Sequence, residues 1–337
     1  MPLTAEFKKN ARLEKYLDDL NSLLAATEIE AIARKRAHPK YPVIFIVGAP
    51  GSGTTLVMQW LASTGLFSYP SNLIARFYKA PYLGAKIQRM LTDPELSFRE
   101  EVMLPGADNE DFFSSDLGQT RGLFAPNDFS AFWDHLYGRT QNLDYCIEEV
   151  AGLDVAYARS ELAAFESVLD RPLVFKATQL CLQISFLSTM LPNALFFFVR
   201  RHPYYTAQSI YRARQRMFGD TTRWFSHKIP QYARLATQTA FKQVAGQVYY
   251  TNKLIEEQLQ QLPAARRLDI DYDDFCIAPK RVWQGVNKKF NHLGFTLHSN
   301  YYGPDSFESR NAVRLPETEK QRIIAAYYSL SGKKIKL

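Results

Sequence analysis

Short apolar runs recur along the chain and are separated by longer stretches with helical periodicity. We expect buried strands at Val43–Val47, Pro172–Ala177 and Ala194–Pro203, and a fourth strand around Leu268 and Ile270. Buried strands that alternate with helices are typical of a parallel sheet with helices on both faces. The pattern therefore predicts an α/β fold of three layers, α/β/α, around a central parallel sheet.

The N-terminal segment has helical spacing of its own. Apolar residues recur there at intervals of three and four, at Leu13, Leu17, Leu20 and Leu24. This spacing predicts an amphipathic helix that runs to about Ala37, before His38 and Pro39 break it. With no internal repeat or low-complexity linker in the sequence, we expect residues 1–40 to pack on a single α/β domain of residues 41–337. A helical and loop insertion is expected at about 67–154.

Composition places the chain among ordinary folded proteins. It has 337 residues, of which 46% are hydrophobic and 22% charged. The N-terminus lacks the apolar core of a secretory signal, and no apolar stretch is long enough to cross a bilayer, so the cytoplasm is the expected location. Cys146, Cys181 and Cys276 are isolated in the sequence, which argues against a disulfide framework or a zinc site.

The formal net charge is +7, which favours anionic ligands. The dense basic runs, Arg34–Lys40 and the C-terminal GKKIKL, lack the interleaved glycine and aromatic residues of RNA-binding segments. We therefore expect a small anionic ligand and no nucleic acid as a partner.

The stretch GAPGSGTT, Gly48–Thr55, lies between the first predicted strand and a helix. Gly48 and Gly53 have the spacing of a Walker A phosphate-binding loop, but Thr54 stands where that loop has its lysine. Because kinases and NTPases need this lysine, such an activity is disfavoured. The glycines still allow the loop to curl around an anion at the start of a helix. The alternative is a strand-to-helix turn without a ligand.

A second candidate for anion binding follows the third predicted strand. Arg201 ends the apolar run, and Ser209 lies eight residues later in a predicted helix. A guanidinium group matches the geometry of a phosphate, and a serine hydroxyl adds a donor. Taken alone, an arginine at a strand end is more often a surface ion-pair residue.

With these pieces in this order, the chain resembles the sulfotransferase family, whose members transfer a sulfuryl group from 3′-phosphoadenosine 5′-phosphosulfate (PAPS) to an acceptor. The similar stretches are GAPGSGTT, RHPYYTAQS and LDIDYDDFCIAP, and the resemblance extends over about residues 41–295. In this family the lysine-less loop holds the phosphosulfate, and the strand-end arginine and the serine hold the 3′-phosphate. The resemblance therefore implies a PAPS site, with no metal, formed by Gly51, Ser52, Gly53, Thr54, Thr55, Arg201, Ser209, Tyr272 and Arg310.

Within this implied site, Tyr272 would lie near the adenine. Arg310, with Arg314 as the alternative, would come from a C-terminal loop that reaches the 3′-phosphate. The stretches FSYPSNLIARFYKAPYLGAKI and GQTRGLFAPNDFSAFW resemble a bacterial branch associated with polysaccharide or other glycan acceptors.

The candidate catalytic residues depart from the family pattern. Most relatives carry Lys or Arg where this chain has Gly51, and the resemblance makes Lys176 the candidate that supplies the missing charge. Asp128 falls where glycan-type relatives place an acid, and His135 lies on the same face if the segment is helical. Either group could accept the proton of an acceptor hydroxyl. The ordinary alternatives are a solvated lysine, a helix-capping aspartate and a surface histidine.

Some relatives use a glutamate after the first helix, where this chain has Ser71 and Asn72, so the base is expected elsewhere. Arg76 is a candidate for holding an anionic acceptor. The sequence thus predicts a PAPS-dependent sulfotransferase that acts on a hydroxyl of a carbohydrate or glycoconjugate. A lipid-linked or small hydroxylated acceptor, a non-catalytic PAPS-binding relative and, less favoured, a kinase or NTPase are the alternatives.

Overall fold

A parallel sheet forms the centre of the molecule. In the computed structural model, residues 3–96, 110–138, 153–297 and 300–335 are described. The strands run in the order β4-β1-β5-β6, all parallel. Their bounds are Ile44–Val47 for β1, Val174–Lys176 for β4, Leu195–Arg200 for β5 and Arg267–Asp271 for β6. These bounds confirm the α/β class and the strands expected from the apolar runs.

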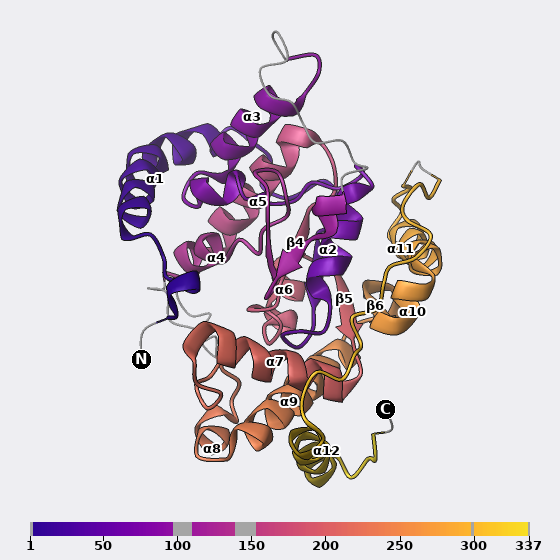
Figure 1. Ribbon diagram of the computed structural model, residues 1–337. Coiled ribbons are helices and arrows are strands. Elements are labelled where there is room, and N and C mark those ends of the chain that lie inside the picture. The colour runs from indigo at the N-terminus through magenta and orange to yellow at the C-terminus, as the bar shows by residue number, and fades with distance from the viewer. Residues whose placement is uncertain (1–2, 97–109, 139–152, 298–299, 336–337) are drawn as a thin grey trace.

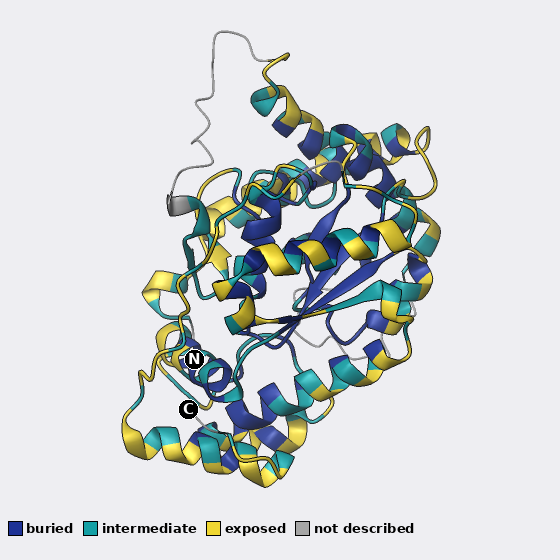
Figure 2. Cartoon of the chain, turned by 90° about the vertical axis from the view of Figure 1, so that its right-hand side faces the viewer, coloured by how far each residue is buried: buried dark blue, intermediate teal, exposed yellow. Residues whose placement is uncertain are grey.

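The two faces of the sheet pack against different helices, as expected for strands whose side chains alternate in direction. Phe45 and Val47 contribute to a core that includes α5 (Val155–Leu169), α6 (Ile184–Met190) and part of α9 (Ala240–Gln260). Ile44 and Ile46 belong to the opposite core, with α2 (Thr54–Ser63), α10 (Tyr272–Ile277) and α11 (Pro279–His292). Figure 2 shows the buried sheet between these helical layers. The three-layer prediction is confirmed.

A helical layer lies beyond the carboxyl ends of the strands. It contains α7 (Pro203–Phe218), α8 (Tyr232–Ala236), α9 and α12 (Glu317–Ser331), and forms the lower part of Figure 1. Tyr204, Ile210, Val248 and Ile323 form a small core that joins α7, α9 and α12. After β4, a turn-rich segment leads to α6, which begins at Ile184.

The N-terminal helix packs on the insertion, and Leu17, Leu20 and Leu24 of the predicted stripe are half-buried. Helix α1 (Ala11–Ile32), preceded by the short η1 (Ala5–Phe7), ends before Ala37. Its fully buried residues are Asn21, Glu28 and Ile32, whereas Leu13 is exposed. The Asn21 side chain donates to Arg76 O and accepts from Lys79 N, both at 2.8 Å. Buried polar groups therefore attach α1, each satisfied by backbone partners.

The described part of the predicted insertion consists of short elements. They are η2 (Ile74–Phe77), α3 (Pro81–Thr92), η3 (Glu110–Phe113), the hairpin strands β2 (Ser115–Asp116) and β3 (Gln119–Thr120), and α4 (Ser130–Leu136). A further short helix, η4 (Ala264–Arg266), precedes β6. The hairpin turn at Leu117 and Gly118 has positive φ angles of 47° and 84°. Such a turn matches the twist of a tight two-residue hairpin.

Strand β6 is the last strand of the sheet within the described residues. Leu268 and Ile270 pack toward the core formed with α11, while Asp269 and Asp271 are exposed. Across the described part of the chain, no helix is both long enough and apolar enough to span a bilayer. Cys181 and Cys276 are buried free thiols, and Cys146 lies outside the described residues.

Candidate active site

The turn between β1 and α2, Gly48–Thr55, has the curled backbone expected for a phosphate-binding loop, and we call it the cradle. Gly51 and Gly53 adopt positive φ angles of 83° and 102°. No side chain among the described residues caps the first turn of α2, which begins at Thr54. The N–H groups of that turn therefore face the loop with the positive end of the helix dipole.

Gly51 is in close contact with α7. A Cβ atom at this position would lie 2.9 Å from both the Cβ and the Oγ of Ser209, and the positive φ disfavours any side chain. The structure thus brings Gly51 and Ser209 together, as the resemblance implied. In this backbone conformation, position 51 has no room for the basic side chain that relatives carry there.

The inner surface of the cradle contains an unsatisfied hydroxyl group. Ser52 is 1% exposed, and its Oγ has no hydrogen-bond partner among the described residues. Buried polar groups without a partner are uncommon in native proteins and call for a ligand or water. Together with the uncapped helix start at Thr54 and Thr55, this observation fits an oxyanion in the loop.

Arg201 connects the cradle to the C-terminal segment. Its guanidinium donates to Gly51 O at 2.9 Å, to Asn311 Oδ1 at 2.7 Å and to Arg310 O at 2.9 Å. Partial burial lowers the pKa of Arg201 from its usual value. Because that usual value is far above 7, the guanidinium is still a cation at neutral pH. The predicted strand-end arginine is therefore placed beside the loop by the end of β5.

Tyr272 forms a wall of the cradle. Its side chain is only 3% exposed, and the Arg201 guanidinium lies 4.6 Å from the ring centroid. A Cβ atom at Gly53 would overlap the same ring, and the phenol oxygen accepts from Arg310 N at 3.1 Å. Because Arg201 and Gly53 lie against the ring, Tyr272 is placed to shape the loop.

A C-terminal segment, residues 307–314, crosses the edge of the cradle, and we call it the strap. Asp273 accepts from the side chains of Ser309 and Asn311. Gln208, on α7, donates to Ala312 O at 2.9 Å and accepts from Arg314 N at 2.7 Å. The Arg310 and Arg314 side chains are exposed. The main chain of Arg310 therefore contacts Arg201, while the side chain of Arg310 is exposed beside the site.

Lys176 lies at the end of β4 and reaches from the cradle to the insertion. Its Nζ lies 3.5 Å from Thr55 Oγ1, donates to Gly118 O at 2.7 Å and lies 3.8 Å from Asp128 Oδ2. The Lys176 side chain is 9% exposed, whereas that of Asp128 is 46% exposed. The predicted cation and one predicted base thus belong to a single cluster, which we call the lysine cluster (Thr55, Gly118, Asp128, Lys176).

The neighbouring asparagines hold Asp128 in place. Asn127 donates to Asn72 Oδ1 and accepts from Phe129 N, both at 2.8 Å. Asn72 in turn donates to Gly122 O at 2.8 Å. Asn72, where some relatives have a glutamate, therefore fixes the loop that carries Asp128.

His135 lies apart from the lysine cluster. It is at the end of α4, which begins at Ser130, so Asp128 precedes this helix and the helical condition for a shared face is not met. Within the described residues, no hydrogen bond or ion pair joins His135 to Asp128 or Lys176. Partial burial, and then the charge of Lys79, lower the pKa of His135, which favours a neutral ring at pH 7. Arg76 is exposed beside α1.

The hairpin is the part of this site that sequence reasoning missed. Its tip, at Leu117 and Gly118, lies over Lys176 and Thr55. The only local signal was the DLGQ turn, because two-residue strands have no periodicity to detect. Gln59 of α2 supports its base by donating to Phe112 O at 2.7 Å and to Ser114 O at 3.0 Å.

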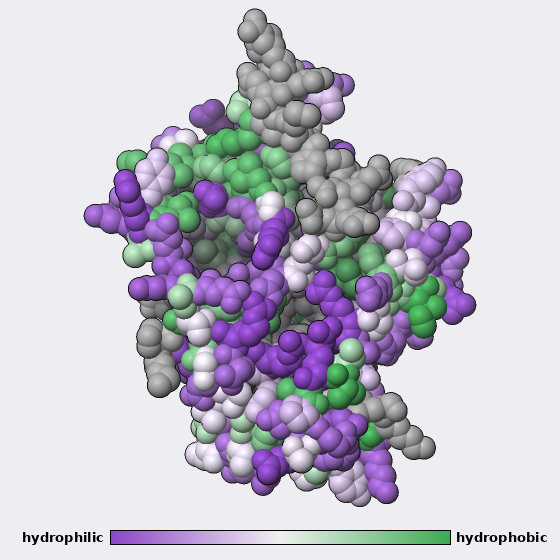
Figure 3. Space-filling model, viewed as in Figure 1, coloured by the Kyte–Doolittle hydropathy of each residue, from purple (hydrophilic) through white to green (hydrophobic). Residues whose placement is uncertain are grey.

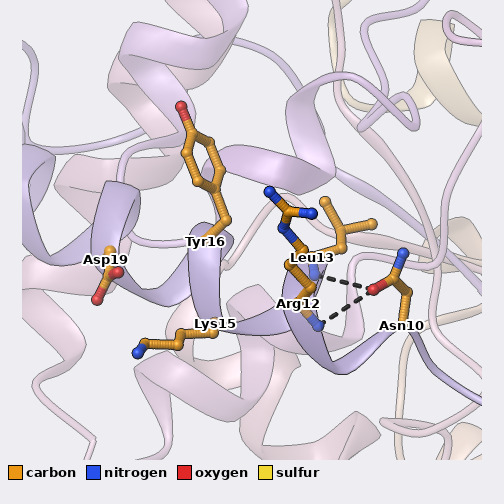
Figure 4. A pocket seen from close by; sticks show the side chains of 6 residues that line it. All are labelled: Asn10, Arg12, Leu13, Lys15, Tyr16 and Asp19. Atoms are coloured by element: carbon orange, nitrogen blue, oxygen red, sulfur yellow. Dashed lines mark hydrogen bonds between the residues drawn. The ribbon is translucent and has the colours of Figure 1, made fainter.

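Two hollows are visible on the molecular surface near the N-terminal half of the chain (Figure 3 and Figure 4). Figure 3 shows hydrophilic residues gathered above α7 and a hollow with hydrophobic walls between α1 and α7, over α4. A separate surface pocket is lined by Asn10, Arg12, Leu13, Lys15, Tyr16 and Asp19, all at the start of α1 (Figure 4). It shares no residue with the cradle or the lysine cluster, so we do not assign it to the same site.

Comparison with protein families identifies one match over most of the chain. The model described as the sulfotransferase family matches residues 42–292, which include the cradle, Lys176, Arg201 and Tyr272. A comparison with curated protein sequences gave no significant match.

Solved structures give a more distant likeness. Sulfotransferase STF9 from Mycobacterium avium is 15% identical, with a TM-score of 0.51 over 97% of this chain and 87% of that chain. Sulfotransferase STF1 from Mycobacterium tuberculosis H37Rv is 14% identical, with a TM-score of 0.46 over 91% of this chain and 78% of that chain. At this identity, the first of these likenesses supports the fold alone.

The family match covers the sheet and the elements that form the cradle. The structure brings the loop, the strand-end arginine and the serine of α7 together. Because the matched region includes most of the chain, this protein is an enzyme of the sulfotransferase family.

Proposed function

We propose that this enzyme transfers the sulfuryl group of PAPS to a hydroxyl of a carbohydrate or glycoconjugate acceptor, and that it does so in the cytoplasm. The observation that carries the proposal is the position of Lys176, which lies between the cradle and a carboxylate. An ammonium group at this point can stabilise negative charge at the cradle, and the carboxylate can accept a proton from an acceptor.

The cradle residues fit the donor. The orphan Ser52 hydroxyl and the uncapped start of α2 supply hydrogen-bond donors for an oxyanion. Arg201 and Ser209 lie beside Gly51, with the side chain of Arg310 exposed nearby. When bound, PAPS supplies an activated sulfuryl group. The residues of this chain orient the donor, neutralise its charge and accept the acceptor proton.

Lys176 takes the role that a basic residue at position 51 has in relatives. Its ammonium is close to Thr55 at the start of α2, and burial of the side chain strengthens its electrostatic effect. Asp128, more exposed and held by Asn127, is our candidate for the base. His135 stays a second candidate, since a neutral imidazole is a competent base but no contact places it in the lysine cluster.

The carbohydrate acceptor rests on the sequence resemblance. A hollow with hydrophobic walls and a hydrophilic rim, as in Figure 3, is compatible with a sugar ring and its hydroxyls. A non-catalytic PAPS-binding protein is the second candidate function, because Gly51 removes the usual cation from the loop.

A thermal-shift experiment tests the donor site. Adenosine 3′,5′-bisphosphate should raise the unfolding temperature, magnesium ATP should raise it less, and Arg201→Ala should abolish the effect of the bisphosphate. Since a ligand at 100 times its Kd stabilises by about 2.7 kcal/mol, the shift is easily measured. No shift with the bisphosphate, or one that Arg201→Ala leaves intact, would overturn the proposed donor.

Turnover assays distinguish an enzyme from a binding protein. With a panel of glycan acceptors, the release of adenosine 3′,5′-bisphosphate from PAPS should fall at least 100-fold in Lys176→Ala and in Asp128→Asn, while bisphosphate binding persists. The same loss in His135→Ala, with activity retained in Asp128→Asn, would move the base to His135. PAPS binding without turnover on any acceptor would favour the non-catalytic function.

A further inference from the structure

The β2–β3 hairpin places a backbone carbonyl against the lysine cluster. Lys176 Nζ donates to Gly118 O at 2.7 Å, which is the shortest of the three contacts of this ammonium with the cluster. The carbonyl directs the Lys176 side chain toward the interval between Thr55 and Asp128. The position of the hairpin therefore decides where the charge of Lys176 lies.

Little within the hairpin itself holds this position. Each strand has only two residues, and isolated two-stranded hairpins are marginally stable in water. Leu117 also takes a positive φ of 47°, which is unfavourable for a residue other than glycine. The tip must be fixed by contacts with the rest of the molecule.

The strongest of those contacts at the tip comes from α7. Both carboxylate oxygens of Asp116 accept from Arg216, at 2.7 and 3.0 Å, in a bidentate ion pair. Arg216 also donates to Glu6 at 2.6 Å, and its main-chain oxygen accepts from Thr4 at 2.8 Å. Arg310 of the strap contributes a longer contact, 3.4 Å, to Ser115 O. Arg216 therefore connects the hairpin to α7, the helix that carries Ser209.

We infer that Asp116 and Arg216 are a positioning pair that holds the hairpin, and through Gly118 O the ammonium of Lys176, in the arrangement used for transfer. Neither residue belongs to the cradle or to the lysine cluster. The catalytic consequence of this inference rests on the proposed function. The inferred coupling between the ion pair and Lys176 does not, because it is argued from the contacts of the hairpin.

Exposure of the pair argues for positioning and against a large contribution to stability. The side chains of Arg216 and Asp116 are 39% and 38% exposed. Ion pairs at such positions contribute little to the free energy of unfolding. Loss of the pair should therefore leave the fold intact while the hairpin and Lys176 become less ordered.

Chemical labelling tests the coupling without any turnover. We expect an N-hydroxysuccinimide ester of acetic acid, with mass spectrometry of the peptides, to acetylate Lys176 about fivefold faster in Asp116→Asn than in the unaltered enzyme. Glu6→Gln is the matched control, because it removes the other side-chain partner of Arg216 and leaves Asp116 in place. The unfolding temperature of both variants should stay within a few degrees of the original.

A second variant and their combination complete the test. Arg216→Gln should raise the labelling rate as Asp116→Asn does, and the double variant should add nothing further, because both changes break the same pair. Equal labelling in the original enzyme and both single variants, or equal acceleration in Glu6→Gln, would overturn the inference.

Kinetics then test the catalytic consequence. In Asp116→Asn we expect kcat to fall about tenfold and the KM for PAPS to change less than about twofold, since small displacements of a positioned group cost mainly the chemical step. An unchanged kcat in an active enzyme refutes the positioning role and leaves the proposed function standing. An original enzyme without turnover on any acceptor refutes the proposed function, and labelling of Lys176 still decides the coupling.

Discussion

At the scale of single residues, the most informative position is Gly51. Most relatives carry Lys or Arg at this position, and this chain does not. In the structure, the positive φ and the contact with Ser209 leave no room for a side chain, and Lys176 approaches the same cradle from the neighbouring strand β4. A charge that one residue supplies in relatives is thus available from another element.

Substitution of Gly51 by alanine should therefore be costly. The strained φ and the overlap with Ser209 should together lower the free energy of unfolding by about 2 kcal/mol, and affinity for adenosine 3′,5′-bisphosphate should fall about tenfold. Gly65→Ala is the matched control, because Gly65 has a φ of 68° but nothing within 4 Å of an added Cβ atom. It should cost about 1 kcal/mol without changing affinity. Equal effects of the two variants in denaturant melts and calorimetry would refute the role of the Ser209 contact.

At the scale of elements, α1 is attached through buried carboxyl groups. Glu28 on α1 accepts from Tyr82 N and Leu83 N, at 2.6 and 3.1 Å. Burial raises the pKa of Glu28, and burial with the adjacent Glu28 raises the pKa of Glu161, on α5, to about 9. Tyr157 also faces this pair. The folded protein therefore favours the protonated, uncharged form of these carboxyl groups.

This arrangement predicts that the protein loses stability as the pH rises. A carboxyl whose pKa is higher in the folded state adds most to the free energy of unfolding when the pH is below its pKa in the unfolded chain, about 4.5. This contribution to stability is lost as the pH approaches 9, the pKa of Glu161 in the folded protein. The unfolding temperature should therefore fall between about pH 5 and 9, with Glu166, whose pKa burial raises to about 7, acting in the same direction. Glu161→Gln, which mimics the protonated group, should flatten the curve. A profile unchanged by Glu161→Gln would contradict this account.

The same elements show how far sequence reasoning reached. The strands were predictable because parallel strands buried on both faces are continuously apolar, as in Phe45 and its neighbours. The cradle loop was predictable because Gly48 and Gly53 have the spacing of a phosphate-binding loop, and its neighbours because Ser209 follows Arg201 by eight residues. The attachment of α1 was not, since Asn21 and Glu28 interrupt the apolar pattern, and neither was the hairpin, whose role depends on contacts distant in sequence.

At the scale of the whole molecule, charge should govern donor binding. The formal net charge of +7 and the cations near the cradle attract a polyanion such as PAPS. Arg201 follows β5, and the strap brings Arg310 next to it from a distant part of the chain. Both arginines therefore lie at the carboxyl ends of the strands.

Salt should therefore weaken the binding of adenosine 3′,5′-bisphosphate. We expect its Kd, measured by calorimetry, to rise about tenfold between low and moderate salt, where the screening length falls to about 10 Å. Arg201→Ala should reduce this dependence, whereas Lys253→Ala, which removes a cation from an exposed pair on α9, should not. A salt dependence that is equal in both variants would show that general charge, and not the cradle, attracts the ligand.

The charge pattern of β6 also affects the behaviour of the protein in concentrated solution. An uncovered edge strand offers free backbone groups to which a strand of another molecule can pair. Arg267, Asp269 and Asp271 alternate with the apolar residues of β6, and the two aspartates are exposed. Pairing two such edges would force these charged side chains into the new interface. The last described strand of the sheet therefore discourages aggregation through strand pairing while its other side chains complete the core.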